Sequence, residues 1–116
     1  MVPSISVSTI IQGNVRGLCS YDRTKILTLS RLALMHNSVA IALTETHISE
    51  DIEDNEINID GWSQFRGDRA MRKCGGSILY IKEGLTVSNE TSFSNGYCDM
   101  AGVYISNRNL AIISIY

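Results

Sequence analysis

Residues 39–47, Val-Ala-Ile-Ala-Leu-Thr-Glu-Thr-His, constrain the fold of this chain more than any other stretch. The stretch opens with five apolar residues, which is typical of a strand buried on both faces. It ends in a carboxylate and an imidazole, Glu45 and His47. Residues two apart on a strand share a face, so we expect both side chains to point out of one end of a sheet. The simpler alternative is a surface turn without function.

The preceding residues predict a strand, a helix and a connection into that stretch. Residues 4–11 alternate polar and apolar side chains and then become apolar, which favours a strand, and residues 12–17 contain turn-forming Gly and Asn. Residues 22–37 carry apolar side chains at helical spacing. The helix stripe is formed by Ile26, Leu29 and Ala33 and widened by Leu27, Leu32 and Leu34. A right-handed crossover between parallel strands would place Asn14 and Glu45 at one sheet edge.

The rest of the chain predicts β-structure around polar loops. Residues 48–60 are acidic and patternless, which indicates a solvated loop, and residues 61–66 predict a short strand. Further strands are expected at 77–82, 85–92, 99–106 and 110–116, with hairpin turns at 83–84 and 107–109. The last of these strands is nearly all apolar, as a central strand would be. We therefore interpret the chain as cut within a domain.

Composition narrows the class of protein. The 116 residues make one domain or part of one, and 44% apolar content is enough for a core. A net charge of −2 provides no general basic field for nucleic acid. The sequence has no membrane-spanning run, and its three cysteines lack a paired spacing. We expect a soluble intracellular protein with free thiols and no membrane partner.

Two groups of residues are candidates for chemistry. Asn14 and Glu45 offer the hard oxygen ligands that Mg²⁺ prefers, although Asn14 is equally suited to stabilise a turn. His47 would hydrogen-bond a phosphate, position Glu45, or serve only the structure. A basic loop beside two glycines would clamp a DNA phosphate backbone, or would simply be a solvated surface. Its cations are Arg66, Arg69, Arg72 and Lys73.

Several segments, in order and spacing, resemble the endonuclease/exonuclease/phosphatase superfamily. More narrowly, they resemble the apurinic-endonuclease-like domain of non-LTR retrotransposons. The segments are Asn-Val-Arg-Gly-Leu at 14–18, Ile-Ala-Leu-Thr-Glu-Thr-His at 41–47, Gly-Trp at 61–62 with Phe-Arg-Gly-Asp-Arg at 65–69, Gly-Gly-Ser-Ile-Leu-Tyr-Ile at 75–81, and Ile-Ile-Ser-Ile-Tyr at 112–116. The resemblance covers nearly all of residues 1–116.

This resemblance implies an α+β fold, a four-layer αββα sandwich of the DNase I-like type, truncated here to its N-terminal half. It implies nicking of double-stranded DNA with Mg²⁺ (or Mn²⁺), which leaves a 3′-hydroxyl to prime a reverse-transcriptase domain downstream. By position, Glu45 and Asn14 would bind or orient the metal, and Tyr116 would contact the scissile phosphate. His47 would support them. A functional protein of this kind would work in the nucleus.

The chain also departs from the family. The later Asp-x-Asn and Ser-Asp-His motifs are absent. Gln12 and Gly13 stand before Asn14 where the family more often has an apolar or tryptophan residue, and Cys74 stands where a third glycine is frequent. We expect this partial domain to lack hydrolysis on its own. Two alternatives stay open: a non-catalytic remnant or interaction module that keeps a partial sandwich, and a phosphatase or lipid phosphodiesterase of the same superfamily. The sequence does not indicate an oligomeric state or a target site.

Overall fold

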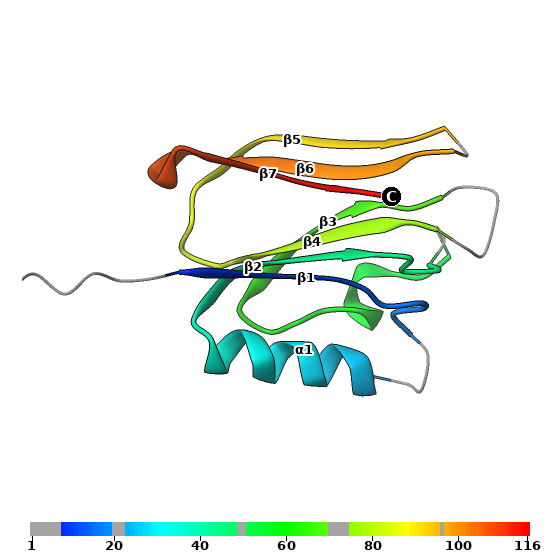
Figure 1. Ribbon diagram of the computed structural model, residues 1–116, viewed down its shortest axis with the longest axis horizontal. Coiled ribbons are helices and arrows are strands. Elements are labelled where there is room, and N and C mark those ends of the chain that lie inside the picture. The colour runs from blue at the N-terminus through cyan, green and yellow to red at the C-terminus, as the bar shows by residue number, and fades with distance from the viewer. Residues whose placement is uncertain (1–7, 20–22, 49–50, 70–74, 96) are drawn as a thin grey trace, which may run out of the picture.

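Two β-sheets lie face to face, and one helix covers the outer side of the first sheet (Figure 1). The computed structural model describes residues 8–19, 23–48, 51–69, 75–95 and 97–116. Within them the first sheet has the order β1-β2-β4-β3 and the second the order β5-β6-β7. The predicted α+β class with two stacked sheets is confirmed, and these residues form its helix layer and both sheet layers.

The regular elements are short. In chain order they are β1 Thr9–Asn14, α1 Thr24–Met35, β2 Ser38–Thr44, η1 Asp54–Glu56, β3 Trp62–Gly67, β4 Ser77–Lys82, β5 Val87–Ser94, β6 Asp99–Ile105, η2 Ser106–Arg108 and β7 Leu110–Ile115. Among the described residues, no helix has the length and apolar character needed to span a membrane.

The predicted crossover is confirmed in the first sheet. β1 pairs with β2 in parallel, α1 connects them, and Asn14 lies opposite Thr44 at the carboxyl ends of both strands. β2 then pairs antiparallel with β4, and β4 with β3. The end of β2 therefore lies in the middle of the sheet, where neighbouring strands hold it on both sides.

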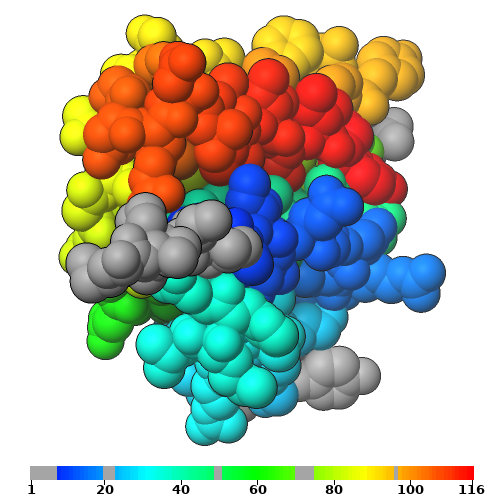
Figure 2. Space-filling model, turned by 60° about the vertical axis from the view of Figure 1, so that its left-hand side comes forward, coloured from blue at the N-terminus to red at the C-terminus, as the bar shows by residue number. Residues whose placement is uncertain are grey.

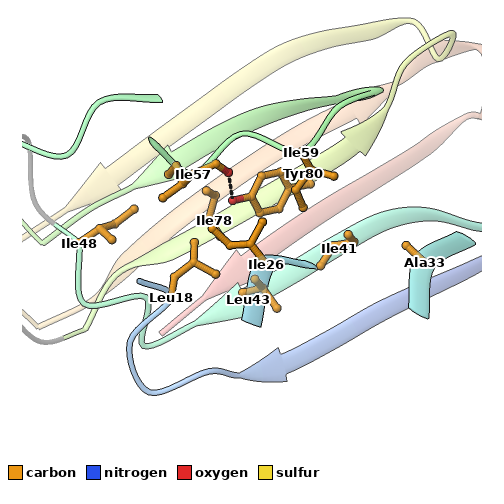
Figure 3. Packing of buried hydrophobic residues seen from close by; sticks show 10 residues of the cluster. All are labelled: Leu18, Ile26, Ala33, Ile41, Leu43, Ile48, Ile57, Ile59, Ile78 and Tyr80. Carbon is orange, nitrogen blue, oxygen red and sulfur yellow. Dashed lines mark hydrogen bonds between the residues drawn. The ribbon is translucent and has the colours of Figure 1, made fainter. Parts of the chain in front are cut away.

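Strand periodicity divides the core into two layers, and Figure 3 shows the layer on the helix side. Alternate residues of β2 and β4 face the helix, and the residues between them face the second sheet. On the helix side lie Ile41, Leu43, Ile78 and Tyr80, packed against Leu18, Ile26 and Ala33. On the other side lie Ala40, Leu79 and Ile81, packed against Ala101, Val103 and Ile105. The prediction that residues 39–43 form a strand buried on both faces is confirmed.

Three predictions about the N-terminal half need correction. β1 continues to Asn14, so residues 12–14 belong to the strand and not to a turn. The helix buries Ile26 and Ala33, but the residues expected to widen its stripe are exposed; these are Leu27 at 51%, Leu32 at 38% and Leu34 at 83%. The acidic loop is only partly solvated, because Ile48, Ile57 and Ile59 are buried in the core.

One prediction about the strands after Gly76 was also wrong. The turn at residues 83–84 does not close a hairpin, because β4 belongs to the first sheet and β5 to the second. Among the described strands β7 pairs only with β6, and it buries only Ile112 and Ser114, so its expected place at the centre of a larger sheet stays a prediction. The hairpin at residues 107–109 is confirmed, and Asn109 turns it with φ +49°.

The sheets touch closely at the end where β2 and β7 finish. The hydroxyl of Ser114 in β7 donates to the carbonyl of Leu43 in β2 at 3.1 Å. On the same side of the stack, Gly67 of β3 lies against the backbone of Met100 in β6, where a β-carbon would overlap it. These contacts fix the end of the second sheet over the end of the first.

Candidate functional site

Three of the predicted site residues converge at this end of the two sheets. Asn14 ends β1, Glu45 follows the last residue of β2, and Tyr116 follows the last residue of β7. The Tyr116 hydroxyl donates a hydrogen bond of 2.6 Å to Glu45 Oε1. We refer to Asn14, Glu45 and Tyr116 together as the Glu45 site. It joins the first sheet to the second through residues 71 positions apart.

The backbone at the Glu45 site is fixed by pairing that continues past the strands. Val15 donates to the carbonyl of Thr44 at 3.0 Å, and Gly17 donates to the carbonyl of Glu45 at 2.7 Å. The Asn14 side-chain oxygen accepts a hydrogen bond from the amide of Arg16 at 3.2 Å. The turn after β1 is thus held against the turn after β2, which keeps Asn14 beside Glu45.

The electrostatic environment favours an ionised Glu45. Hydrogen bonds from Tyr116 and then from Asn14 lower the pKa of Glu45 below its usual range, and the nearby charges of His47 and Arg16 lower it further. Burial opposes them, but it is outweighed, and the pKa stays below its usual range. The site therefore presents a carboxylate that is already deprotonated at neutral pH.

His47 does not occupy the position that strand alternation predicted. β2 ends at Thr44, and both Glu45 and His47 have left-handed backbone conformations, with φ of +53° and +54°. The backbone amide of His47 donates to the carbonyl of Gly75 at 2.9 Å. Its side chain is close enough to Glu45 to influence the carboxylate, but the two do not share a strand face.

The structure pairs two of the predicted phosphate-contacting arginines with carboxylates of this chain, and their phosphate contact stays a prediction. Arg66 donates to Asp68 at 2.6 Å and to Asp54 at 2.9 Å. Arg69 is 9% exposed and pairs with the buried carboxylate of Asp99 at 2.9 Å. Both guanidinium groups therefore hold carboxylates of this chain. The other two predicted contacts, Arg72 and Lys73, lie outside the described residues.

The predicted role of the two glycines also differs. Gly75 and Gly76 are buried, so they do not line a surface for phosphate. A β-carbon at Gly75 would lie within 2.8 Å of Arg69 and Asp99. These glycines instead let the loop pack against the buried ion pair.

Sequence reasoning missed two residues that shape the site. Lys25, in the first turn of α1, donates to the carbonyls of Val15 at 2.5 Å and Gly17 at 2.9 Å. A cation in the first turn of a helix opposes the helix dipole, and this unfavourable placement was the signal available in the sequence. Asp99 accepts several hydrogen bonds beside Tyr116, but as a single acidic residue before an apolar strand it gave no pattern to detect.

A cavity of about 430 Å³ opens beside Asn14. Residues of β1, β2 and β7 line it, including Gln12, Thr44 and Ser114. Figure 2 shows red β7 above blue β1 on this side of the molecule. The cavity lies between β1 and β7, one edge strand of each sheet, next to the Glu45 site.

The Glu45 site has the chemistry of a minimal divalent-metal site. Mg²⁺ is commonly held by one or two carboxylates together with waters and substrate phosphate oxygens. Glu45 supplies one carboxylate, and Asn14 helps to orient it. Across the described residues no three His, Cys, Asp or Glu side chains gather closely enough to form a fuller ligand set. The donor set fits a metal that retains most of its waters.

The fold is similar to solved structures of AP endonucleases. The catalytic domain of APE2 from Xenopus laevis aligns with a TM-score of 0.56 and 17% sequence identity, over 76% of this chain and 27% of that structure. The AP endonuclease LMAP from Leishmania major aligns with a TM-score of 0.57 and 18% identity, over 91% of this chain and 38% of that structure. No family model matches the sequence, and no curated protein sequence matches it. The chain spans about a quarter to two-fifths of the structures it matches, with which it shares the DNase I-like fold.

Proposed function

We propose that this chain supplies the first part of the active site of a metal-dependent DNA endonuclease. The observation that carries the proposal is the convergence of Asn14, Glu45 and Tyr116 at one end of a fold similar to that of AP endonucleases. An ionised carboxylate beside a phenol is suited to hold a cation against a phosphodiester. The sequence identity to the solved AP endonucleases is only 17–18%, so the support for the activity comes from the geometry of the site and not from sequence similarity.

In this proposal each residue has one task. Glu45 and Asn14 bind or orient Mg²⁺ or Mn²⁺, and the hydrogen bond from Asn14 also favours the ionised carboxylate. Tyr116, whose hydroxyl donates to Glu45 in the metal-free chain, contacts the scissile phosphate, and His47 supports the site. Arg72 and Lys73 contact the DNA backbone. When bound, the metal polarises the phosphate and stabilises the charge that develops on the leaving oxygen.

We further propose that the endonuclease belongs to a non-LTR retrotransposon and works in the nucleus. The motif order described above supports this origin. The gene is expected to encode Asp-x-Asn and Ser-Asp-His motifs and then a reverse-transcriptase domain beyond the codon for Tyr116. Sequencing of that region tests the proposal, and an unrelated domain or a membrane anchor there would contradict it.

We expect the 116-residue chain itself not to nick DNA, because one carboxylate cannot both hold the metal and activate water. The test is relaxation of supercoiled plasmid with Mg²⁺ or Mn²⁺, with the Glu45→Ala variant as control. Equal, background-level relaxation by both proteins is the expected result. Nicking by the native chain above the Glu45→Ala control would show that the site is complete enough for hydrolysis.

A non-catalytic module is the second candidate. The observation that favours it is that the described residues contain no cluster of three metal-ligating side chains. Metal binding separates the two candidates, because a remnant without function has no reason to retain it. If Mn²⁺ broadens the NMR signals of Glu45 and not those of distant residues, the endonuclease proposal is favoured.

A further inference from the structure

Asp99 is a fully buried carboxylate at the start of β6. Its Oδ2 accepts hydrogen bonds from Arg69 Nε at 3.0 Å and from the amide of Gly76 at 2.9 Å. Its Oδ1 accepts one from the Ser94 hydroxyl at 2.6 Å. Burial raises the pKa of Asp99, but the hydrogen bonds from Ser94, Gly76 and Arg69 outweigh it, and the pKa lies below its usual range. A buried charge with this many donors is held in one orientation.

Asp99 is connected to Tyr116 by two routes. The backbone amide of each residue donates to the carbonyl of the other at 2.9 Å, which closes the ladder between β6 and β7. The second route runs through Arg69, whose guanidinium carbon lies 5.7 Å from the centroid of the Tyr116 ring. That distance is within the range of a cation–π interaction.

The space for this arrangement is provided by a glycine. A β-carbon at Gly75 would lie 2.7 Å from Arg69 Cζ and 2.8 Å from Asp99 Oδ2. Gly75 also has φ +78°, a conformation that side chains disfavour. Any larger residue would displace the guanidinium from the carboxylate, and with it the cation from the Tyr116 ring.

We propose that Asp99 and Arg69 are positioning residues for Tyr116. Asp99 holds the Arg69 guanidinium against the ring, and the ring so fixed directs its hydroxyl to Glu45. A cation over the ring also draws electron density from it, which makes the phenol a stronger hydrogen-bond donor. The role of this pair in the Glu45 site rests on the proposed function, whereas its coupling to Tyr116 does not.

The test compares two arginine–carboxylate pairs of this chain. Asp99→Asn removes the charge that holds Arg69 and keeps the side-chain shape. Asp68→Asn is the matched control, because Asp68 pairs with the other described arginine of the same segment, Arg66, at 2.6 Å. The measurement is the NMR signals of the Tyr116 ring and the Glu45 carboxyl carbon, in the 116-residue chain without metal or DNA.

Asp99→Asn is expected to shift both sets of signals, and Asp68→Asn to leave them in place even if it lowers the unfolding midpoint. Unchanged Tyr116 signals in Asp99→Asn, or equal shifts in both variants, would overturn the proposal. If Asp99→Asn loses its native circular dichroism, Arg69→Lys replaces it, since it keeps the charge and removes the planar group over the ring. Tyr116 signals that stay unchanged in a folded Arg69→Lys variant would overturn the proposal as well.

A Mn²⁺ titration separates this inference from the proposed function. The native chain should show broadening at Glu45, and Asp99→Asn should require several-fold more Mn²⁺ for the same effect, because its carboxylate is less well oriented. Absence of broadening in the native chain contradicts the proposed function and leaves the coupling to be judged by the metal-free signals. Identical titrations of the two proteins contradict the positioning role and leave the proposed function standing.

Discussion

Three residues around the Glu45 site have left-handed backbone conformations that their side chains disfavour. Arg16, Glu45 and His47 have φ of +45°, +53° and +54°. Each such residue costs on the order of 1 kcal/mol, and such residues concentrate at binding and catalytic sites. The surrounding hydrogen bonds from Gly17 and Val15 hold these turns in place. These conformations lower the stability of the folded chain at the position of the Glu45 carboxylate, as is typical of a functional site.

The hydrogen bonds at Glu45 predict an order of effects on its pKa. Because Tyr116 lowers that pKa most, followed by Asn14 and then the charge of His47, Tyr116→Phe should raise it most, Asn14→Ala less and His47→Ala least. Titration of the Glu45 carboxyl carbon by NMR measures all three. A larger rise in His47→Ala than in Tyr116→Phe would contradict the hydrogen bond as the main cause.

The same shift sets the sign of a pH effect on stability. The folded pKa of Glu45 lies below the ordinary value of 4.5, so folding favours the ionised form. Its contribution to stability is complete above the pKa of the unfolded chain and is lost as the pH falls through the folded pKa. Tyr116→Phe should therefore show a weaker loss of stability on acidification than the native chain.

At the scale of the element, sequence patterns predicted the positions of strands better than they predicted which strands pair in a sheet. β4 occupies residues 77–82 as predicted, and β6 begins at Asp99 as predicted. The turn at 83–84 was misassigned because a short turn fits a hairpin and a change of sheet equally well. Leu34 fits a helical stripe but is 83% exposed, because the packing of α1 on β2 uses only a narrow face. Which sheet a strand joins depends on contacts with residues distant in the sequence, and the pattern within that strand does not contain them.

Only the part of the candidate site that lies within one crossover unit was predictable from sequence patterns. Strand ends bring Asn14 beside Glu45, and the period of the strands and the crossover rule were enough to predict this. Placement of Tyr116 came only from family resemblance. Asp99 contacts Tyr116 at the end of the neighbouring strand and Arg69 in the loop after β3, and these residues are distant in the sequence. No local sequence pattern therefore signals its role.

Gly67 tests the close approach of the two sheets. Because a β-carbon there would overlap the carbonyl of Met100, Gly67→Ala should destabilise the chain by about 1–3 kcal/mol. Gly13→Ala is the matched control in another strand, since a β-carbon at Gly13 meets no atom within 4 Å. It should be neutral or stabilising by roughly 0.5–1 kcal/mol. Urea unfolding followed by circular dichroism measures both, and equal stability of the two variants would contradict the close packing.

At the scale of the whole molecule, apolar surface is unevenly distributed. β1 and β7 each form one edge of a sheet, with β3 and β5 at the opposite edges among the described strands. Both expose isoleucines: Ile10 at 46%, Ile113 at 56% and Ile115 at 57%. Helix α1 exposes Leu34 and Met35 at 83% and 76%. Only the strand edges combine apolar side chains with backbone groups able to pair with another strand. The apolar surface of the strand edges and that of the helix therefore differ in what they can bind.

This difference predicts how the chain associates with itself. If edge pairing is the cause, lysines at Ile113 and Ile115 should reduce association strongly, because charged side chains block the approach of another strand. The matched control, Leu34→Lys with Met35→Lys, removes even more exposed apolar surface from the helix and should leave association unchanged. Sedimentation velocity at several concentrations measures both. An equal reduction by the helix variant would mean that apolar area drives association, and the free backbone of the edge strands would then have no special part in it.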